Sequence, residues 1–323
     1  MLDNDPMTTP PTGSTRPTGS VAVRDVALRD GLQLTEGRLR TEAKVELIRT
    51  LLELGVPELE VGSMARPDLV PALADTLEVI AALDESERRR CWVWVATPGQ
   101  VRRAAAAGAR RFQYCLSVTD QHNRANIGRD TETSMAALPD AVDAATAAGG
   151  TVQLCLATAF TCPVTGAVDP DRVLELIADP RGAGTVDVVL ADTLGQARPR
   201  QVGALVAAAA GPADGRRIVF HGHDTWGMGV ANALAAVEAG AGMVDGALGG
   251  LGGCPFAPGA SGNTATEDVV FALRPDWLGP EVFHALVRAG DRMLAGLGER
   301  SRSRASAGAH GSGRGFDWTL PRG

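Results

Sequence analysis

Two histidines separated by one residue, His221 and His223, are the sharpest chemical signal in the sequence. They end a β-rich run that begins at Arg217, and residues two apart on a strand project their side chains to the same side. Convergent imidazoles can bind a metal ion, and Asp30, at the end of the first β-rich run, can supply an anionic oxygen. The sequence therefore predicts a divalent-metal site held mainly by Asp30, His221 and His223.

Other interpretations of this trio stay open from the residues alone. An HxH pattern occurs by chance, and the two rings can simply form structural hydrogen bonds. Two histidines and one carboxylate also describe a non-haem iron site, as in oxygenases. A catalytically inactive barrel that serves as a binding protein is a further alternative, and it would lack residues of the site.

Arg29 and Glu60 carry opposite charges near the predicted metal site. Arg29 is adjacent to Asp30, and the simplest interpretation is a structural salt bridge. A permanent cation beside a metal-bound carboxylate can also stabilise an enolate oxygen. Glu60 lies in the second β-rich run, where a lone buried carboxylate would be costly. We expect Glu60 to pair with Arg29, an ion pair that would also orient the arginine.

The segment 249–263, GGLGGCPFAPGASGN, is rich in glycine and contains Cys254. A loop of this composition can act as a lid, and a thiol on a lid can donate a proton to a carbanion. An inert buried cysteine is the competing interpretation. Asp192, which ends the sixth β-rich run, is expected to cap a helix that follows it. No function is assigned to the remaining histidines and cysteines, namely His122, His284, His310, Cys91, Cys115, Cys155 and Cys162.

Eight β-rich runs alternate with Ala- and Leu-rich helical segments, many of which end at glycine. This alternation predicts a parallel sheet, and closure into a (β/α)₈ TIM barrel leaves no exposed edge. Active sites of such barrels lie at the carboxyl ends of the strands, where the residues above are found, whereas few charged residues fall in the middle of the runs. The runs are Val21–Leu28, Glu58–Gly62, Cys91–Thr97, Arg111–Ser117, Thr151–Thr158, Val186–Ala191, Arg217–His221 and Met243–Leu248.

The domain organisation follows from this pattern. Residues 21–298 are predicted to form a single α/β catalytic domain with an extra C-terminal helix. Residues 1–20 are rich in Pro, Thr and Ser and are expected to be a disordered leader, and residues 299–323 a flexible C-terminal tail.

Composition limits the classes of partner. The net charge of −7 argues against nucleic acid, because there is no basic surplus to neutralise phosphates. No run approaches the roughly 20 apolar residues of a membrane helix, so no membrane is expected. Five cysteines without CxxC spacing, and no secretory signal, favour a reducing compartment, the cytoplasm.

Three segments resemble 3-hydroxy-3-methylglutaryl-CoA lyase: RDGLQ from Arg29, HGHDT from His221, and GGLGGCPFAPGASGNTATED over 249–268. The similarity extends from about Val21 to Leu273. The cysteine-containing loop is the specific part. The Arg-Asp and HxH elements are shared with a wider group of metal-dependent aldolase-like barrels, which includes isopropylmalate and homocitrate synthases. A Claisen-type condensing synthase of that group is therefore the alternative function.

The resemblance implies retro-Claisen cleavage of 3-hydroxy-3-methylglutaryl-CoA, or a related 3-hydroxyacyl-CoA, to acetyl-CoA and a 3-keto acid such as acetoacetate, a step of leucine catabolism. It implies Mg²⁺ or Mn²⁺ as the cation and an acyl-CoA as the substrate, and we expect a homodimer. Asp30, His221, His223 and Asn263 match metal ligands. Arg29, Cys254 and His221 match catalytic positions, and Glu60, Asp192 and Glu267 match supporting acidic positions of the same site.

Some positions depart from the family pattern. The fifth β-rich run has Gln153 and Cys155 where a basic and an aromatic residue are common. Leu34-Thr35 stands where the family usually has Asn-Glu. These positions shape the substrate pocket rather than the metal site, so they leave the acyl group of the substrate open.

Overall fold

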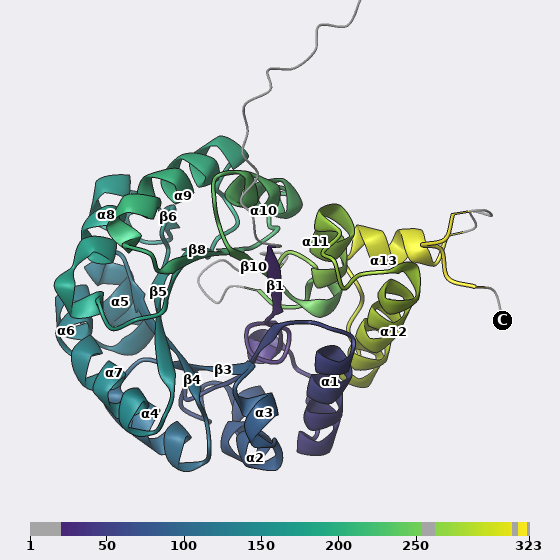
Figure 1. The fold of residues 1–323 in the computed structure, drawn as a ribbon, viewed down its shortest axis with the longest axis horizontal. Coiled ribbons are helices and arrows are strands. Elements are labelled where there is room, and N and C mark those ends of the chain that lie inside the picture. Colours follow the sequence, from purple (N-terminus) through teal and green to yellow (C-terminus); the bar gives the residue numbers. More distant parts are fainter. Residues whose placement is uncertain (1–20, 254–261, 312–315, 322–323) are drawn as a thin grey trace, which may run out of the picture.

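The computed structural model describes residues 21–253, 262–311 and 316–321. Eight parallel strands close into a barrel in the order β1-β10-β9-β8-β5-β4-β3-β2, and helices surround it (Figure 1). The predicted (β/α)₈ TIM barrel is therefore confirmed. The strands are β1 (Ala22–Asp25), β2 (Glu58–Ser63), β3 (Cys91–Val95), β4 (Arg111–Ser117), β5 (Thr151–Ala157), β8 (Asp187–Asp192), β9 (Arg217–Gly222) and β10 (Met243–Gly246).

The strand register fixes which side chains meet at the mouth of the barrel. The first and last strands close the sheet, with Ala22 opposite Met243 and Asp25 opposite Gly246. His221 on β9 lies opposite Ala191 on β8. The pairing of β2 with β3 shifts between Glu60 and Gly62, so a local irregularity follows the buried Glu60.

Helix α1 shows how the sequence pattern produces the outer layer. Its residues Val45, Ile48 and Leu51 recur every three positions and are buried against the barrel. The chain then turns at Gly55, whose φ of +100° a residue with a side chain rarely adopts. The helices are α1 (Thr41–Glu53), α2 (Thr76–Ala82), α3 (Glu85–Arg88), α4 (Pro98–Ala106), α5 (Asp120–Ile127), α6 (Thr131–Ala136), α7 (Leu138–Ala147), α8 (Pro170–Ala178), α9 (Pro199–Ala213), α10 (Gly229–Glu238), α11 (Thr266–Leu273), α12 (Pro280–Leu297) and α13 (Arg304–Ala309).

Two separate apolar groups hold the barrel. The larger core lies between the outer face of the strands and the helices, and includes Val93, Phe112 and Val188. A small second cluster consists of inward-facing strand residues: Cys115, Cys155, Ala157, Val189, Val219 and Met243, with Ala22 and Trp94 packed against it. Within the described ranges, no helix is long and apolar enough to cross a membrane.

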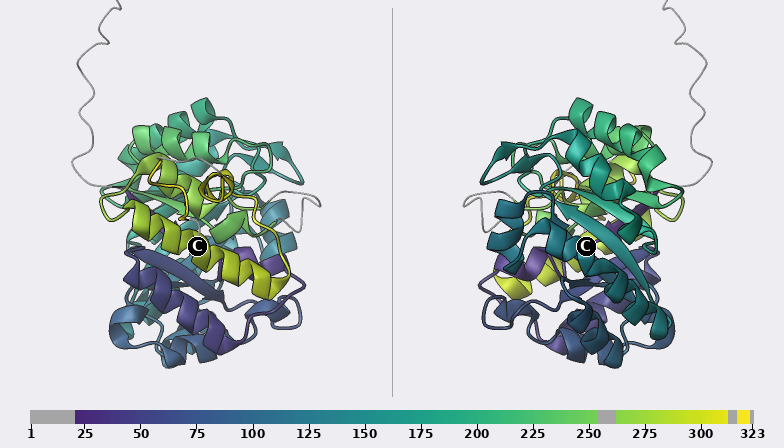
Figure 2. Two further views of the ribbon diagram at one scale, coloured as in Figure 1. Left: turned by 90° about the vertical axis from the view of Figure 1, so that its right-hand side faces the viewer. Right: turned by 90° about the vertical axis from the view of Figure 1, so that its left-hand side faces the viewer.

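The C-terminal segment departs from the predicted flexible tail. Helix α13 begins after Ser303, whose hydroxyl accepts a hydrogen bond from the amide of Ser306 and donates one to Asp268. Trp318 packs edge-to-face on Phe271. The prediction is wrong over this stretch because small Ser and Ala residues, which give little hydrophobic periodicity, pack closely onto α11. Figure 2 (left) shows the yellow C-terminal helices covering the outside of the barrel.

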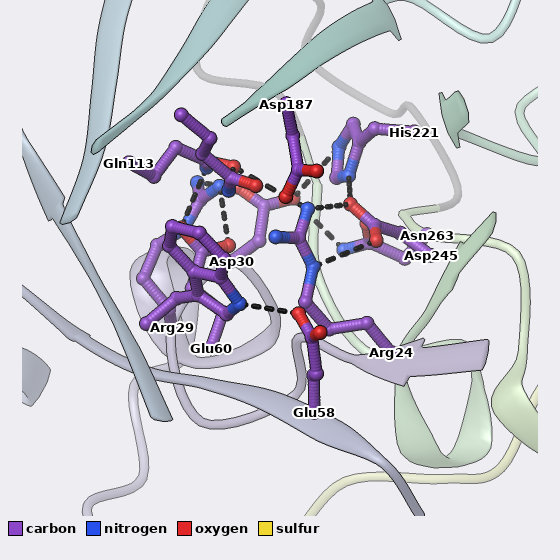
Figure 3. A network of polar contacts seen from close by, with 12 residues as sticks. Arg24, Arg29, Asp30, Glu58, Glu60, Gln113, Asp187, His221, Asp245 and Asn263 are labelled. Carbon is purple, nitrogen blue, oxygen red and sulfur yellow. Dashed lines mark hydrogen bonds and ion pairs between the residues drawn. The ribbon is translucent and has the colours of Figure 1, made fainter. Parts of the chain in front are cut away.

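Charged side chains occupy the inside of the barrel, and some of them, such as Arg24, lie in the middle of a strand, contrary to the expectation that few would. Arg24 on β1 is fully buried and Asp245 on β10 nearly so. Glu58, Asp187 and Arg217 lie at the starts of their strands. The charges are tolerated because they pair with one another, as Figure 3 shows for Arg24 and Asp245. Arg217 pairs in the same way with Glu58 and with Asp187.

Candidate active site and metal centre

The carboxylate of Asp30 is the point on which the predicted ligands converge. Asp30 follows β1, and its Oδ2 lies 3.1 Å from His223 Nε2 and 3.8 Å from His221 Nε2. Ligand atoms of these three buried residues all lie within 4.8 Å of one another, the single such group among the described residues. The structure thus brings Asp30, His221 and His223 together at the carboxyl ends of β1 and β9; Figure 3 labels Asp30 and His221.

Asn263 completes this cluster. Its Nδ2 donates to Asp30 Oδ2 at 2.9 Å and to the carbonyl of Leu251 at 3.0 Å. Its Oδ1 and the Nδ1 of His223 are buried, and neither has a hydrogen-bond partner among the described residues. A half turn of the amide presents the oxygen to the cluster. Two imidazoles, a carboxylate and an amide oxygen form a donor set that suits a divalent cation, so the residues fit a metal.

The charge state of Asp30 also suits a cation. Burial by itself raises the pKa of a carboxyl group, but the Arg29 guanidinium, whose Nη1 lies 2.6 Å from Asp30 Oδ1, and the two histidines together outweigh it. The pKa of Asp30 is held well below its usual range, with His223 contributing in the same direction. Asp30 is therefore ionised and ready to bind a metal ion.

The expected ion pair between Arg29 and Glu60 is present. Arg29 Nη2 lies 2.8 Å from Glu60 Oε2, and the other carboxylate oxygen accepts a 2.6 Å hydrogen bond from Gln113 Nε2. Burial raises the pKa of Glu60, while Arg29 and Arg24 oppose that shift. Arg29 thus lies between two carboxylates, which fix its guanidinium beside the metal-ligand cluster.

His221 has a partner that the sequence analysis missed. Its Nδ1 lies 3.1 Å from Asp245 Oδ2, and Asp245 is in turn bound by Arg24. Burial lowers the pKa of His221, but the hydrogen bond to Asp245 and the charge of Asp30 outweigh burial and raise it. The available signal was an aspartate inside the otherwise apolar strand Met243–Gly246.

A cavity of about 90 Å³ opens beside the cluster. Arg29, Asp30 and the two histidines line one part of it. The sequence analysis assigned no function to His122 and Cys115, yet both line the cavity, as does Cys155, which was expected to shape the substrate pocket. The other lining residues are Gln33, Trp94, Gln113, Asn126, Ala157, Ala191, Thr193 and Gly253.

Asp192 and Glu267 bind backbone amides instead of the cluster. Asp192 accepts hydrogen bonds from the amides of Gln196 and Ala197 at 3.1 and 3.0 Å, so it caps the loop before α9 rather than a helix directly after it. Both oxygens of Glu267 accept from the amide of Gly249 at 3.0 and 2.9 Å. Burial raises the pKa of Glu267 to about 8. Neither carboxylate is among the described residues that line the cavity.

Cys254, the predicted proton donor, lies outside the described residues, as does most of the candidate lid 249–263. The described ends of that segment lie at the site. Gly253 lines the cavity. Gly262 accepts a hydrogen bond from the amide of Asp224, which follows His223, at 2.9 Å.

Comparisons with known proteins agree with this geometry. The HMGL-like family model matches residues 20–289. The (R)-citramalyl-CoA lyase of Chloroflexus aurantiacus is 36% identical over 290 residues, which cover 86% of this chain and 92% of that protein. The hydroxymethylglutaryl-CoA lyase YngG of Bacillus subtilis is 34% identical over 253 residues, 78% of this chain and 85% of that one.

Solved structures give the same result. The HMG-CoA lyase of Bacillus subtilis superposes with a TM-score of 0.83 at 31% identity and covers 90% of this chain and 98% of its own. An HMG-CoA lyase from Acinetobacter baumannii, in complex with coenzyme A and 3-methylmalate, gives 0.82 at 31% identity, covering 94% and 98%. The fold, the ligand cluster and these relatives define a carbon–carbon lyase. The chain belongs to the HMGL-like family.

Proposed function

We propose that this protein cleaves 3-hydroxy-3-methylglutaryl-CoA to acetyl-CoA and acetoacetate, with Mg²⁺ or Mn²⁺ bound by Asp30, His221, His223 and Asn263. The observation that carries the proposal is the convergence of these four residues next to Arg29 at the mouth of the barrel. Active sites of TIM barrels are found at this end. The resemblance of the 249–268 segment and the named lyases among the relatives support the reaction class.

The reaction breaks the bond between the carbinol carbon and the carbon next to the thioester. The tertiary hydroxyl loses its proton and becomes the ketone of acetoacetate, and the electron pair of the broken bond forms a thioester enolate. A divalent cation at the cluster would supply Lewis acidity, lowering the pKa of the hydroxyl and orienting it.

The protein's own residues account for the rest of the chemistry. Arg29 faces the cavity as a permanent cation and stabilises the enolate oxygen, while Glu60 fixes its guanidinium. Cys254, or alternatively His221, returns a proton to the enolate carbon to give acetyl-CoA. Asp192 and Glu267 support the site through the backbone amides that they bind.

A second substrate is supported by the relative from Chloroflexus aurantiacus, which is named for citramalyl-CoA. A citramalyl thioester would undergo the same cleavage and release pyruvate in place of acetoacetate. The small side chain of Cys155 in the cavity wall, where an aromatic residue is common in the family, fits a change in the acyl group. The same residues would carry both reactions.

Product analysis separates these functions. Purified protein is incubated anaerobically with Mg²⁺ or Mn²⁺ and with each thioester, and acetyl-CoA, acetoacetate and pyruvate are quantified. Acetoacetate supports the first substrate, and pyruvate alone supports the second. No cleavage of either, together with CoA release from acetyl-CoA and a 2-keto acid, would establish the condensing synthase instead. Cys254→Ala, assayed in parallel, should lose activity if the thiol delivers the proton.

A further inference from the structure

Asp245 connects a metal-site histidine to the interior of the barrel. Arg24 binds it with two parallel hydrogen bonds, Nε to Oδ1 at 2.9 Å and Nη2 to Oδ2 at 2.8 Å. The same Oδ2 lies 3.1 Å from His221 Nδ1. Arg24 is completely buried and Asp245 is 3% exposed, so water does not compete for these contacts. Figure 3 shows the three side chains in sequence along this path.

This contact determines which nitrogen of His221 can bind a metal. A neutral imidazole carries one proton, and a carboxylate oxygen that already accepts from Arg24 can only accept from Nδ1–H. The lone pair then lies on Nε2, the nitrogen that faces Asp30. His223 is different, because its Nε2 faces Asp30 while its Nδ1 has no hydrogen-bond partner in the described part of the chain. The protein therefore orients one of the two rings through a side chain.

Arg24 is itself fixed by the network below the site. Its Nη2 also lies 3.4 Å from Gln113 Oε1, and Gln113 donates to Glu60, the partner of Arg29. The indole ring of Trp92 lies 5.9 Å from the guanidinium carbon of Arg24. A buried path thus joins Arg29, on one side of the cluster, to His221 on the other. Movement of Asp245 would require this whole path to rearrange.

We propose that Asp245, held by Arg24, is a positioning residue of the metal centre that keeps His221 with Nε2 free for the cation. The proposal rests on the metal site of the proposed function but not on the identity of the substrate. Hydrogen-bonded partners of metal-binding histidines typically account for about 10- to 100-fold in metal affinity. A carboxylate next to an arginine that served only the fold would have no such effect.

The test is Mn²⁺ affinity, measured from the electron paramagnetic resonance signal of free Mn²⁺ on metal-depleted protein without substrate. In Asp245→Asn one carboxylate oxygen becomes an NH₂ group, which faces Arg24 Nε if it replaces Oδ1, and both Arg24 Nη2 and His221 Nδ1 if it replaces Oδ2. Facing His221, it donates to Nδ1 and moves the ring proton to Nε2, where it blocks the metal. We expect Asp245→Asn to bind Mn²⁺ about 10- to 100-fold more weakly than the wild type.

Asp187 provides a matched control. It is 4% exposed and is bound by Arg217 in the same two-point geometry, at 3.0 and 2.7 Å, but it lies at the start of β8, away from the histidines. Asp187→Asn should weaken Mn²⁺ binding by less than about threefold. Equal losses in the two variants, or a loss below threefold for Asp245→Asn, would overturn the proposal.

Two further measurements keep the test decisive. If Asp245→Asn does not fold, the double variant Arg24→Gln with Asp245→Asn leaves no charge unpaired and should show the same loss of affinity. Nitrogen-15 spectra of histidine in the metal-free protein at pH 9 report the tautomer directly, with His221→Ala to assign the signal. The wild type should show Nδ1–H at His221 and Asp245→Asn a mixture, whereas unchanged spectra would contradict the proposal. Weak Mn²⁺ binding by the wild type itself would instead count against the metal site of the proposed function.

Discussion

The inside of the barrel has a lower and an upper charged layer, which use the same residue types in different ways. The lower layer, at the strand starts, consists of Glu58, Arg111, Asp187 and Arg217. Glu58 lies 2.9 Å from Arg111 and 3.2 Å from Arg217, and accepts a 2.5 Å hydrogen bond from the indole of Trp92. Asp187 is bound at two points by Arg217. In the lower layer, both carboxylates are therefore paired with arginines.

The upper layer, at the strand ends, consists of Arg29, Asp30, Glu60, His221 and His223. Its charges are also paired, but Asn263 Oδ1 and His223 Nδ1 beside them have no hydrogen-bond partner among the described residues. Burying a polar atom without a partner costs free energy, which a bound ion can offset. The comparison indicates that the closed lower network serves the fold, and the incomplete upper network supports the proposal that an ion binds there.

Asp30→Asn should break the upper layer with the largest effect on function. The variant keeps the size of the side chain but removes the anion on which the two histidines converge. Since partners one step further from a metal already account for about 10- to 100-fold, we expect kcat/KM to fall by at least about 100-fold. Steady-state cleavage assays and Mn²⁺ titration check this outcome. Activity within about tenfold of the wild type would show that Asp30 is not a metal ligand.

Glu58→Gln should break the lower layer and affect stability instead. Loss of one partner from a buried ion-pair network costs about 3 kcal/mol, at the low end because Arg111 and Arg217 are partly exposed. Folded protein should retain kcat/KM within about threefold. Denaturant unfolding measures the stability and the cleavage assay measures the activity. A large loss of activity without a loss of stability would show that the lower layer serves the reaction and not the fold.

The pH dependence of the stability difference between the wild type and Glu58→Gln tests the role of the Glu58 charge. Burial raises the pKa of Glu58, but Arg217 and Arg111 outweigh it and lower the pKa below 4.5. A lowered carboxyl pKa gives stability that is fully present above about pH 4.5 and is lost as the pH falls through the folded-state value. The difference between wild type and Glu58→Gln should therefore disappear in acid. A constant difference down to low pH would mean that the charge of Glu58 is not responsible.

The two layers also differ in how far the sequence predicts them. The strands were predictable because their outer faces form apolar runs, and Asp30, His221 and His223 because they end such runs. The pairing of Glu58 with Arg217 in the lower layer, which are 159 residues apart, was not predictable, because only barrel closure brings the starts of β2 and β9 together. Inside a barrel, each charge needs partners from other strands, and one strand does not reveal them.

Glu267→Gln tests an acid that supports the upper layer from outside. Burial raises the pKa of Glu267 from 4.5 to about 8, so the folded protein holds a proton that the unfolded chain has released. Its contribution to stability is present at low pH and is lost as the pH rises from about 4.5 towards 8. Glutamine removes this penalty, so the variant should gain about 3 kcal/mol over the wild type between pH 5 and pH 8.

Unfolding free energies of the two proteins at several pH values provide the measurement. Gly249 begins the segment that leads to Gly253 in the cavity wall, and its amide still has an oxygen acceptor in the variant. An equal gain at pH 5 and pH 8 would show that the raised pKa of Glu267 is not the cause.

Cys155→Ala should produce the smallest effect, a change in substrate preference. Cys155 lies on the inner face of the barrel, opposite Cys115 on β4, and both line the cavity beside Arg29. Removing the sulfur enlarges the space for the acyl group without touching a metal ligand. We expect the ratio of kcat/KM for 3-hydroxy-3-methylglutaryl-CoA to that for the citramalyl thioester to change by about three- to tenfold, less than a full methylene group in a hydrophobic pocket can give.

Cys91→Ala is the matched control for this variant. Cys91 is equally buried, but it belongs to the core outside the strands and is not among the residues that line the cavity. Both variants lose a similar apolar contact, so their unfolding free energies should fall by about 1 kcal/mol each. The ratio of kcat/KM values for the two substrates should change in Cys155→Ala alone. The inner face of a barrel strand borders the cavity, whereas the outer face contacts a helix. A similar change in Cys91→Ala would mean that the ratio responds to general loosening of the barrel and not to the wall beside Arg29.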